Sequence, residues 1–478
     1  MVEAGFTPEF EKQVVAEIKQ LVSKPPVADA GSQRDMRSLI WSSIDNPESK
    51  DLDQLEYVER QPDGKARVMI AIADVDSFVP KGSASDQHAF HNTTSVYTGV
   101  ATFPMLIDDL SFNLTSLIQD VDRSAIVIDL VIDQKGTLVS QNVYLALVRN
   151  RAKLDYLSIG SWFEKGGNPP DKVAAIPGLK EQLLLQNQVK EQIRTLRREQ
   201  GSLHLQTTEA QTVAEDGKVL DIQEVEENQA RDLIENFMVS ANIGISHFLE
   251  NKKLPSLRRV VKTPERWPKI VEIAAEYGVE LPAKPDAKSL ARFLLDRKDA
   301  DPLRFPDLSL AIVKLLGRGE YTVEIPGQAD LGHFALAVHD YTHATAPNRR
   351  YVDLATQRLV KAVLAGQATP YTLDELNGVA NQCTEREHAA KKVERIMRKV
   401  AAAVYLSKHI GETYEALVTG INEDGTYARL LKPPAEGKIV KGERGLEVGD
   451  KVRLKLLAAD PEQAFIDFAL VKKLGKAP

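Results

Sequence analysis

Cysteine is almost absent from this chain of 478 residues, in which Cys383 is the only one. A single thiol excludes an internal disulfide framework and any metal site built from several thiolates. Hard cations bound by oxygen ligands are therefore the natural metal candidates. A chain without disulfides also fits a reducing compartment.

Long apolar runs are absent too, and the first residues, MVEAGFTPEFEKQ, lack a basic segment followed by an apolar one. Both absences argue against a membrane span and a secretory leader, so we expect a cytoplasmic protein with no membrane partner. The formal net charge of −7 argues against indiscriminate coating of nucleic acid. Basic residues cluster at 252–262 and 391–399, where a solvated helix face is the usual explanation, although an acidic protein can hold a confined basic channel.

Hydrophobic periodicity divides the chain into regions with helix-like spacing and regions with strand-like spacing. Residues 7–23 have helical spacing and end before Pro25 and Pro26, and residues 36–145 are rich in strand-like segments. Helical periods follow at 172–200, 228–250, 265–278, 307–318, 352–365 and 373–409. Strands followed by helices around one core predict an α+β architecture.

After Gly411 the sequence changes to short alternating strands separated by turns. About five strands in about seventy residues suit a small closed barrel such as an OB-fold, which often binds single-stranded nucleic acid. An SH3-like barrel without a ligand fits the same pattern.

The stretch SIDNPESKDLDQ concentrates acidic side chains near the front of the chain. Asp51 and Asp53 project to the same side of an extended backbone, and Asp45 joins them if the chain turns at Asn46 and Pro47. Converging carboxylates repel each other unless a cation neutralises them. Magnesium does so with carboxylates, water and phosphate oxygens, and two ions about 4 Å apart serve phosphoryl displacement.

Spacing alone favours a plainer interpretation of the same stretch, namely a surface turn with solvated acids. A calcium loop fits less well, because the acids do not alternate after Asp45 and the central glycine is missing.

Five segments match, in the same order, the motifs of one enzyme family. They are RDMRSLIWSSIDNPESKDLDQ, VMIAIADVDSFVPKGSASDQHA, NTTSVYTGVATFPMLIDDLSFNLTSL, LIENFMVSANI and THATAPNRRYVDLATQRLV. Together they make the chain resemble the RNase II family of exoribonucleases, whose catalytic module is called RNB. The trailing barrel resembles the S1-type OB-fold of many members. The resemblance implies a short helical segment and linker at 1–33, an RNB domain with a sheet core and packed helices at 34–408, and an S1-type domain at 409–478.

The resemblance also implies an activity: magnesium-dependent hydrolysis of single-stranded RNA from its 3′ end, releasing nucleoside 5′-monophosphates. Two Mg²⁺ ions are expected, for which Mn²⁺ can substitute. We infer no obligate protein partner and expect a monomer. The matched region begins too near the front of the chain for the two cold-shock-type barrels of many relatives, so we expect an altered preference between structured and unstructured RNA.

Residue roles follow from the same resemblance. Catalytic residues are Asp53, regarded as most critical, with Asp51, Asp45 and Arg349, and the metal ligands are Asp45, Asp51, Asp53 and Gln54. The residues expected to contact substrate are Tyr97 on the terminal base, Tyr156 and Glu235 on ribose hydroxyls, Glu394 and Arg350. Without the family, Arg349 reads as a structural ion pair, Tyr97 as a half-buried strand residue, Tyr156 as core and Glu235 as helix surface.

Gln54 departs from the family, which has a fourth aspartate at this position. Glutamine offers a neutral oxygen and cannot neutralise a dication, so the affinity for one ion should fall unless Asp74 or nearby acids compensate. Three milder departures are Ala346, Asn348 and Gln357. The alternative to an active exoribonuclease is therefore a catalytically impaired RNB protein that binds RNA. A third possibility, a magnesium phosphohydrolase of small nucleotides, is disfavoured by the terminal barrel.

Overall fold

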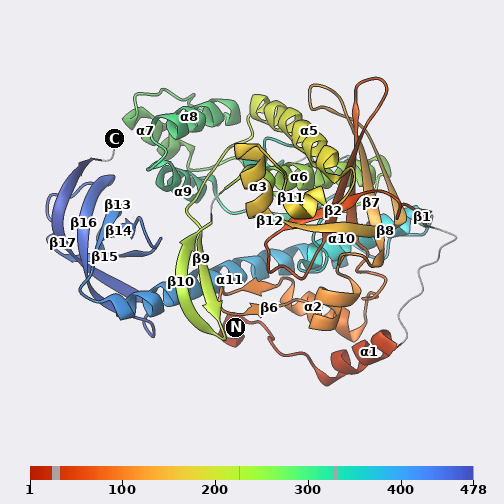
Figure 1. Ribbon diagram of the computed structural model, residues 1–478, viewed down its shortest axis with the longest axis horizontal. Coiled ribbons are helices and arrows are strands. Elements are labelled where there is room, and N and C mark those ends of the chain that lie inside the picture. The colour runs from red at the N-terminus through yellow and green to blue at the C-terminus, as the bar shows by residue number, and fades with distance from the viewer. Residues whose placement is uncertain (24–32, 226, 328–331, 477–478) are drawn as a thin grey trace.

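The computed structural model describes residues 1–23, 33–225, 227–327 and 332–476. It consists of a curled sheet, helices packed around that sheet, and a separate barrel at the C-terminal end (Figure 1). The predicted α+β architecture, a sheet core with packed helices followed by a small β-barrel, is confirmed.

The central sheet has six strands in the order β1-β8-β2-β3-β4-β7. One half of β8 pairs with β7 and the other half with β2, so the sheet curls back on itself. Side chains of β4 are buried along nearly the whole strand, as expected for a strand covered on both faces. The strands are β1 (Arg34–Asp35), β2 (Trp41–Asp45), β3 (Gln54–Arg60), β4 (Ala66–Ala73), β7 (Asp122–Ile132) and β8 (Leu138–Asp155).

Helices cover this sheet and carry residues of the predicted site. In α10, only a few residues are not buried, so this helix runs through the protein interior. Helix α6 packs closely on β7: a Cβ added to Gly244 would lie 2.7 Å from Leu130 Cδ2 and 3.3 Å from Ile128 Cγ2. The helices nearest the sheet are α3 (Tyr156–Lys165), α5 (Leu179–Gln200), α6 (Gln229–Asn251) and α10 (Tyr351–Leu364).

The remaining helices extend the core or link it to the barrel. The predicted helical periods are all present, whereas α2, α3, α8 and the hairpin β9–β10 were not predicted. Within the segment expected at 1–33, α1 is present and the linker at 24–32 lies outside the described residues. These helices are α1 (Lys12–Ser23), α2 (Ala84–Asn92), α4 (Asp171–Ala174), α7 (Trp267–Glu276), α8 (Ala287–Ala300), α9 (Phe305–Leu316) and α11 (Leu373–Leu406).

Three two-stranded sheets and four short helical turns complete the part before the barrel. The strand pairs are β5 (Val96–Tyr97) with β6 (Thr102–Phe103), β9 (Ala210–Glu215) with β10 (Lys218–Glu224), and β11 (Ser256–Val260) with β12 (Glu320–Glu324). The turns are η1 (Val2–Ala4), η2 (Leu110–Leu114), η3 (Phe334–Leu336) and η4 (Ser407–His409).

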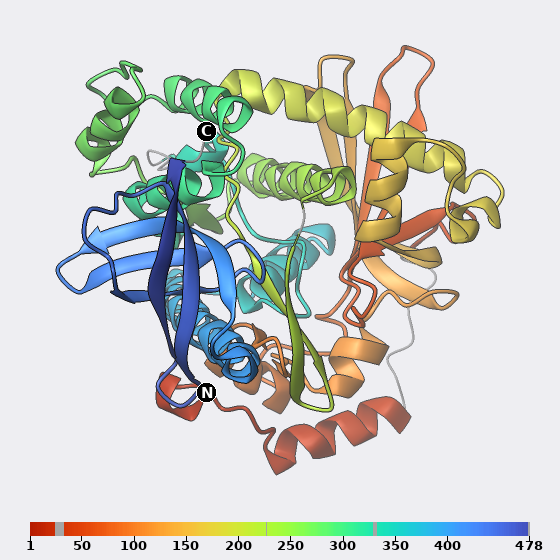
Figure 2. The same cartoon turned by 60° about the vertical axis from the view of Figure 1, so that its left-hand side comes forward.

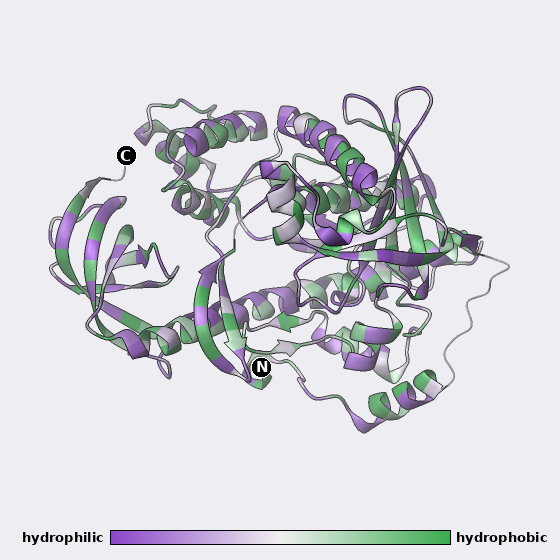
Figure 3. Ribbon diagram, viewed as in Figure 1, coloured by the Kyte–Doolittle hydropathy of each residue, from purple (hydrophilic) through white to green (hydrophobic). Residues whose placement is uncertain are grey.

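The C-terminal strands form a closed barrel in the order β13-β14-β15-β17-β16. Hydrophobic and hydrophilic residues alternate along them, as Figure 3 shows, and the inward ones include the fully buried Leu454 and Phe468. The end of α11 packs into the same core through Leu406, and Arg429 of the barrel pairs with Asp307 of α9 at 2.9 Å. Figure 2 shows the barrel from the side that comes forward in this turned view. The strands are β13 (Thr413–Asn422), β14 (Gly425–Leu430), β15 (Glu436–Lys441), β16 (Asp450–Asp460) and β17 (Phe465–Lys476).

Among the described residues, every helix is too short or too polar to cross a lipid bilayer.

Candidate active site

The acidic stretch lies where two neighbouring strands separate. Strands β2 and β3 pair only at Ser42 and Glu56, and the loop between them opens away from that pair. The hydroxyl of Ser116 fixes the loop, because it donates to the Lys50 carbonyl at 2.7 Å and accepts from the Leu52 amide at 3.0 Å. The loop is therefore held in place by the fold rather than lying free on the surface.

Asp53 is the most buried acid of this loop, with 2% of its surface exposed. Its carboxylate accepts hydrogen bonds from the Asn348 amide at 3.1 Å and from Arg349 Nε at 3.2 Å. Burial raises the pKa of Asp53 to about 7, and the charge of Arg349 opposes this rise. Residues about 300 positions apart in the chain thus meet in an ion pair whose carboxylate is buried and whose guanidinium is partly exposed.

Asp45 and Asp51 stand beside Asp53. The Asp45 carboxylate accepts from the Asn46 amide at 2.6 Å and from Ser49 Oγ at 3.0 Å, and burial raises its pKa. The negative charge of Asp51 raises the pKa of both Asp45 and Asp53 further, so the three carboxylates interact electrostatically. Oxygen atoms are their only donors, and this fits Mg²⁺, which completes its coordination with water and phosphate oxygens.

A tighter acidic group was not predicted from the sequence. In the described part of the chain, the set of three acids whose ligand oxygens all lie within 4.8 Å of one another is Glu250, Glu324 and Asp340. Arg258 neutralises this group from one side, because it pairs with Glu324. The predicted acids of the β2–β3 loop are more widely spaced than this group.

The two consecutive arginines have different surroundings. The Arg349 side chain pairs with Asp53 while 43% of it stays exposed, so it faces both the acids and solvent. Arg350 instead binds Asp353 through two hydrogen bonds of 2.7 and 2.8 Å, and the Asp353 side chain is fully buried. The predicted contact of Arg350 with substrate stays a prediction, and Asp353 competes for the same guanidinium.

Tyr97 connects the acids to helix α11. Its hydroxyl donates to Asp51 Oδ2 at 3.0 Å, and its amide donates to Glu394 Oε1 at 3.1 Å. The residue is 41% exposed, yet the surrounding protein raises the pKa of Tyr97, so the ring lines a recess that is open to water. A cavity of about 190 Å³ adjoins it and is lined by Tyr97, Arg349, Arg350 and Glu394 among others.

The two predicted ribose contacts come from adjacent helices. Tyr156 begins α3, and the guanidinium of Arg231 lies 4.3 Å from the centre of its ring. Burial raises the pKa of Tyr156, and the negative charges of Asp45 and Glu56 raise it further. Glu235 is on α6 and is accessible to solvent, while the protein around it raises its pKa.

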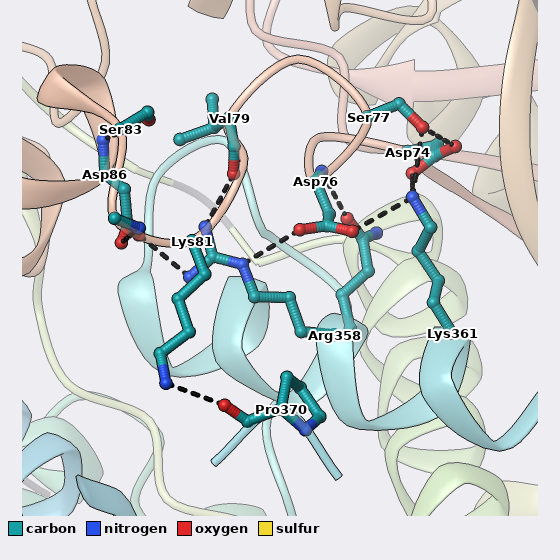
Figure 4. A network of polar contacts seen from close by, with 12 residues as sticks. Asp74, Asp76, Ser77, Val79, Lys81, Ser83, Asp86, Arg358, Lys361 and Pro370 are labelled. Carbon is teal, nitrogen blue, oxygen red and sulfur yellow. Dashed lines mark hydrogen bonds and ion pairs between the residues drawn. The ribbon is translucent and has the colours of Figure 1, made fainter. Parts of the chain in front are cut away.

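Asp74 cannot readily compensate for Gln54. One of its oxygens accepts from Lys361 at 2.8 Å, and the other accepts from Ser77 at 2.6 Å and Ser124 at 3.0 Å. Lys361 belongs to a network that fastens α10 to the loop after β4 (Figure 4). Because both Asp74 oxygens are engaged in this network, we assign Asp74 a structural role.

Glu56 is a buried acid beside the site that the sequence did not point to. It was read only as part of the strand segment LEYVER, yet the structure leaves it fully buried, with no hydrogen-bond partner for either carboxylate oxygen. Burial raises the pKa of Glu56, and the charge of Asp45 raises it further. One feature of the sequence could have drawn attention to Glu56: it comes two residues after Gln54, so both side chains lie on the same face of β3.

The explanation of residues 252–262 as a solvated helix face was wrong for the two arginines, whereas Lys252, Lys253 and Lys262 are exposed. Arg258 and Arg259 lie in strand β11 and are buried, where they pair with Glu324 and Glu387. In the sequence, neighbouring basic residues look the same whether they lie on a surface or in a buried strand. Here each of the two guanidinium groups is neutralised by an acid inside the protein.

The raised pKa of Asp53 predicts how stability depends on pH in metal-free protein. The folded chain keeps the proton up to pH about 7, whereas the unfolded chain loses it near the ordinary value of 3.8. Unfolded protein therefore binds fewer protons in this window, and the free energy of unfolding falls as pH rises through it. In EDTA we expect Asp53→Asn to raise Tm relative to the parent, by a margin that grows from pH about 5.5 to about 7 and then levels off. Scanning calorimetry measures this, and a margin independent of pH would contradict it.

Tyr97 allows stacking to be separated from hydrogen bonding. Tyr97→Ala should weaken the hold on the 3′-terminal base and raise KM roughly tenfold, because base stacking contributes about 1–3 kcal/mol. Tyr97→Phe is the matched control: it keeps the ring and removes only the hydrogen bond to Asp51. Steady-state kinetics on an RNA oligomer should show the larger KM effect for alanine, and equal effects of both variants would argue against stacking.

Comparisons with known proteins identify the family of the chain. The family model described as RNB domain matches residues 33–366. The chain therefore belongs to the RNB-domain family of hydrolytic 3′-to-5′ exoribonucleases, which confirms the resemblance seen in the sequence. A second model, described as the RNase II-type exonuclease C-terminal S1 domain, matches residues 412–471, so the barrel is of the S1 type.

Individual relatives are similar over nearly the whole chain. Ribonuclease R of Thermotoga maritima is 28% identical over 97% of this chain and 68% of its own length. Mycoplasma genitalium RNase R, solved in complex with double-stranded RNA, has a TM-score of 0.86 at 24% identity and covers 98% of this chain and 82% of that chain. Yeast Ssd1, described as a pseudonuclease, has a TM-score of 0.70 at 17% identity and covers 90% of this chain and 53% of that chain.

Proposed function

We propose that this chain hydrolyses single-stranded RNA from its 3′ end, releases nucleoside 5′-monophosphates, and uses two magnesium ions held mainly by Asp45, Asp51 and Asp53. The observation that carries this proposal is that Arg349 pairs with Asp53 and Tyr97 hydrogen-bonds to Asp51, while Asp45 lies within electrostatic range of Arg349 and Asp51. Bound there, magnesium would activate a water molecule and neutralise the attacking and leaving oxygens. We retain the domain boundaries at 33/34 and 408/409 as proposals.

The residues of the chain supply binding and orientation around that centre. Arg349, which is partly exposed beside Asp53, can reach a phosphate oxygen and stabilise the charge that develops on it. Tyr97 offers its ring to the terminal base, and the cavity beside it gives that nucleotide room. We assign Tyr156 and Glu235 to the contacts with ribose hydroxyls, which distinguish RNA from DNA. The S1-type barrel, fastened to α11, would guide the single strand.

Incubation of the purified chain with 5′-labelled oligoadenylate and magnesium tests this function. Stepwise shortening with release of mononucleotides is expected. Intact substrate with retained RNA binding would favour the second candidate, an RNB protein that binds RNA without cleaving it. The neutral Gln54 among the acids is the observation that supports this second candidate. Hydrolysis of free nucleotides with no RNA requirement would instead indicate a small-molecule phosphohydrolase.

We also propose that the protein acts as a cytoplasmic monomer. Light scattering coupled to gel filtration measures the mass in solution, for which 52.9 kDa is expected. A stable dimer would contradict the proposal.

A further inference from the structure

The first residues of the chain lie beside α11 and pack on the strand that carries Tyr97 (Figure 1). Phe6 is 3% exposed and forms a small apolar cluster with Val96 of β5 and Ala390 of α11. Val96 and Tyr97 are neighbours on β5, so their side chains point to opposite sides of the strand. Val96 is fully buried in the cluster, whereas the Tyr97 hydroxyl reaches Asp51. Phe6 therefore supports β5 from the side opposite to the Tyr97 ring.

Strand β5 is too short to hold its own position. It consists of Val96 and Tyr97, which pair only with Phe103 and Thr102 of β6. An isolated pair of strands is at best marginally stable, and this one is far shorter than a usual hairpin, so it depends on the packing around it. Phe103 also packs against the cluster of Phe6. The same apolar contacts thus hold both strands of the pair.

Polar contacts fasten the segment on both sides of Phe6. The amide of Thr7 donates to Asn92 Oδ1 at 2.9 Å, and its carbonyl accepts from Asn92 Nδ2 at 2.8 Å. Helix α2 ends at Asn92, shortly before β5. Arg386 of α11 donates to the Ala4 carbonyl at 3.3 Å, and its guanidinium lies 5.6 Å from the centre of the Phe6 ring. The segment is therefore tied to both α2 and α11.

The other side of Tyr97 faces the groups expected to bind substrate. Val393 of α11 packs against the apolar cluster, and the next residue, Glu394, accepts a hydrogen bond from the Tyr97 amide at 3.1 Å. The amide of Ser95 donates to the Arg349 carbonyl at 3.0 Å. Tyr97, Glu394 and Arg349 all line the cavity of about 190 Å³. Tyr97 thus lies between the apolar cluster and this cavity.

We propose that Phe6 is a positioning residue, which holds β5 in place and so fixes the Tyr97 ring for stacking on the 3′-terminal base. With a small side chain at position 6, a gap would open behind Val96, and β5 could move into it. The ring would then have to be ordered when RNA binds, and this ordering costs affinity. The inference rests on the proposed function, because it takes Tyr97 as the contact to the terminal base.

RNA binding in EDTA tests the proposal without turnover. Fluorescence anisotropy of 5′-fluorescein oligoadenylate gives the Kd of the full chain. Phe6→Ala should raise the Kd about fivefold, because part of the stacking contribution is lost. Phe6→Leu keeps most of the apolar volume and should rescue binding to within about twofold of the parent.

Ile18→Ala is the matched control for a purely structural effect. Ile18 lies on α1, is 1% exposed and belongs to the main core rather than to the cluster of Phe6. We expect Ile18→Ala to lower Tm and to leave the Kd for RNA unchanged. Phe6→Ala should also lower Tm, but it should raise the Kd in the fraction that is folded.

A double-mutant cycle shows whether Phe6 acts through Tyr97. In the Tyr97→Ala background, Phe6→Ala should raise the Kd by less than about twofold, because the ring that it positions is already gone. An unchanged Kd for Phe6→Ala, or the same fivefold effect in both backgrounds, would overturn the proposal.

Gly5→Ala makes the same test if Phe6→Ala fails to fold. Gly5 has a φ of 84°, which alanine adopts only with strain, and an added Cβ would collide with Arg386. The substitution should displace the segment while the Phe6 side chain is kept. It should raise the Kd in the parent but not in the Tyr97→Ala background, and any other pattern would overturn the proposal.

The outcomes also separate this inference from the proposed function. A parent whose RNA binding depends on Phe6 through Tyr97, yet which leaves oligoadenylate intact with magnesium, keeps the inference and contradicts the nuclease. A parent that degrades RNA while Phe6→Ala binds it normally keeps the nuclease and contradicts the inference.

Discussion

Asp53→Asn is expected to lower exonuclease turnover by about 10³-fold while RNA binding changes little. The substitution removes one negative charge from the place where Asp45, Asp51 and Arg349 meet, and asparagine can still accept the hydrogen bond of the Asn348 amide. The fold should therefore persist while metal binding and chemistry fail. Single-turnover degradation of labelled RNA and filter binding measure the two properties.

Asp74→Asn is the matched control for this prediction. Asp74 is also an acid next to a central strand, but it pairs with Lys361 in the network of Figure 4. We expect a lower Tm and an unchanged turnover per folded molecule. An Asp53→Asn protein that digests RNA normally would refute the active-site assignment.

Arg349→Gln is expected to reduce kcat by about 10²–10³-fold with little loss of stability. Loss of a preorganised charge beside a developing phosphate charge has an effect of this size. The side chain is 43% exposed, so its removal leaves solvent rather than a cavity. Arg349→Lys should recover only part of the rate, because an ammonium lacks the planar fork of a guanidinium.

Arg350→Gln provides the contrast one residue later. It removes the two hydrogen bonds that Arg350 donates to the fully buried Asp353, and breaking a buried pair costs about 3–5 kcal/mol. We expect a large fall in Tm for Arg350→Gln and a large fall in kcat for Arg349→Gln. The reverse pattern would exchange the proposed roles of the two arginines.

Elements that depend on the spacing of neighbouring residues could be predicted from the sequence. Helix α11 was predicted from apolar spacing, and its start has a capping box of Thr372 and Glu375. The short barrel strands were predicted because their residues alternate between inside and outside. Helices α3 and α8 were not predicted from the sequence.

The residues of the candidate site could also be predicted only in part. Asp51 and Asp53 are close in sequence, so their grouping could be predicted, and the family motifs added Arg349 and Tyr97. The partners that decide their chemistry could not be predicted. The bond from Arg349 to Asp53 and the capture of Arg350 by Asp353 depend on where α10 packs against the sheet.

Residue order by itself determined which segments become helix or strand and which family the chain belongs to, because periodicity and motifs are properties of neighbouring residues. Tertiary structure alone decided that Asp74 is engaged by Lys361, that Arg258 is buried in an ion pair, and that the buried Glu56 carboxylate has no hydrogen-bond partner. The physical reason is that burial and pairing set the free energy of a charged group, and both depend on contacts between distant parts of the chain.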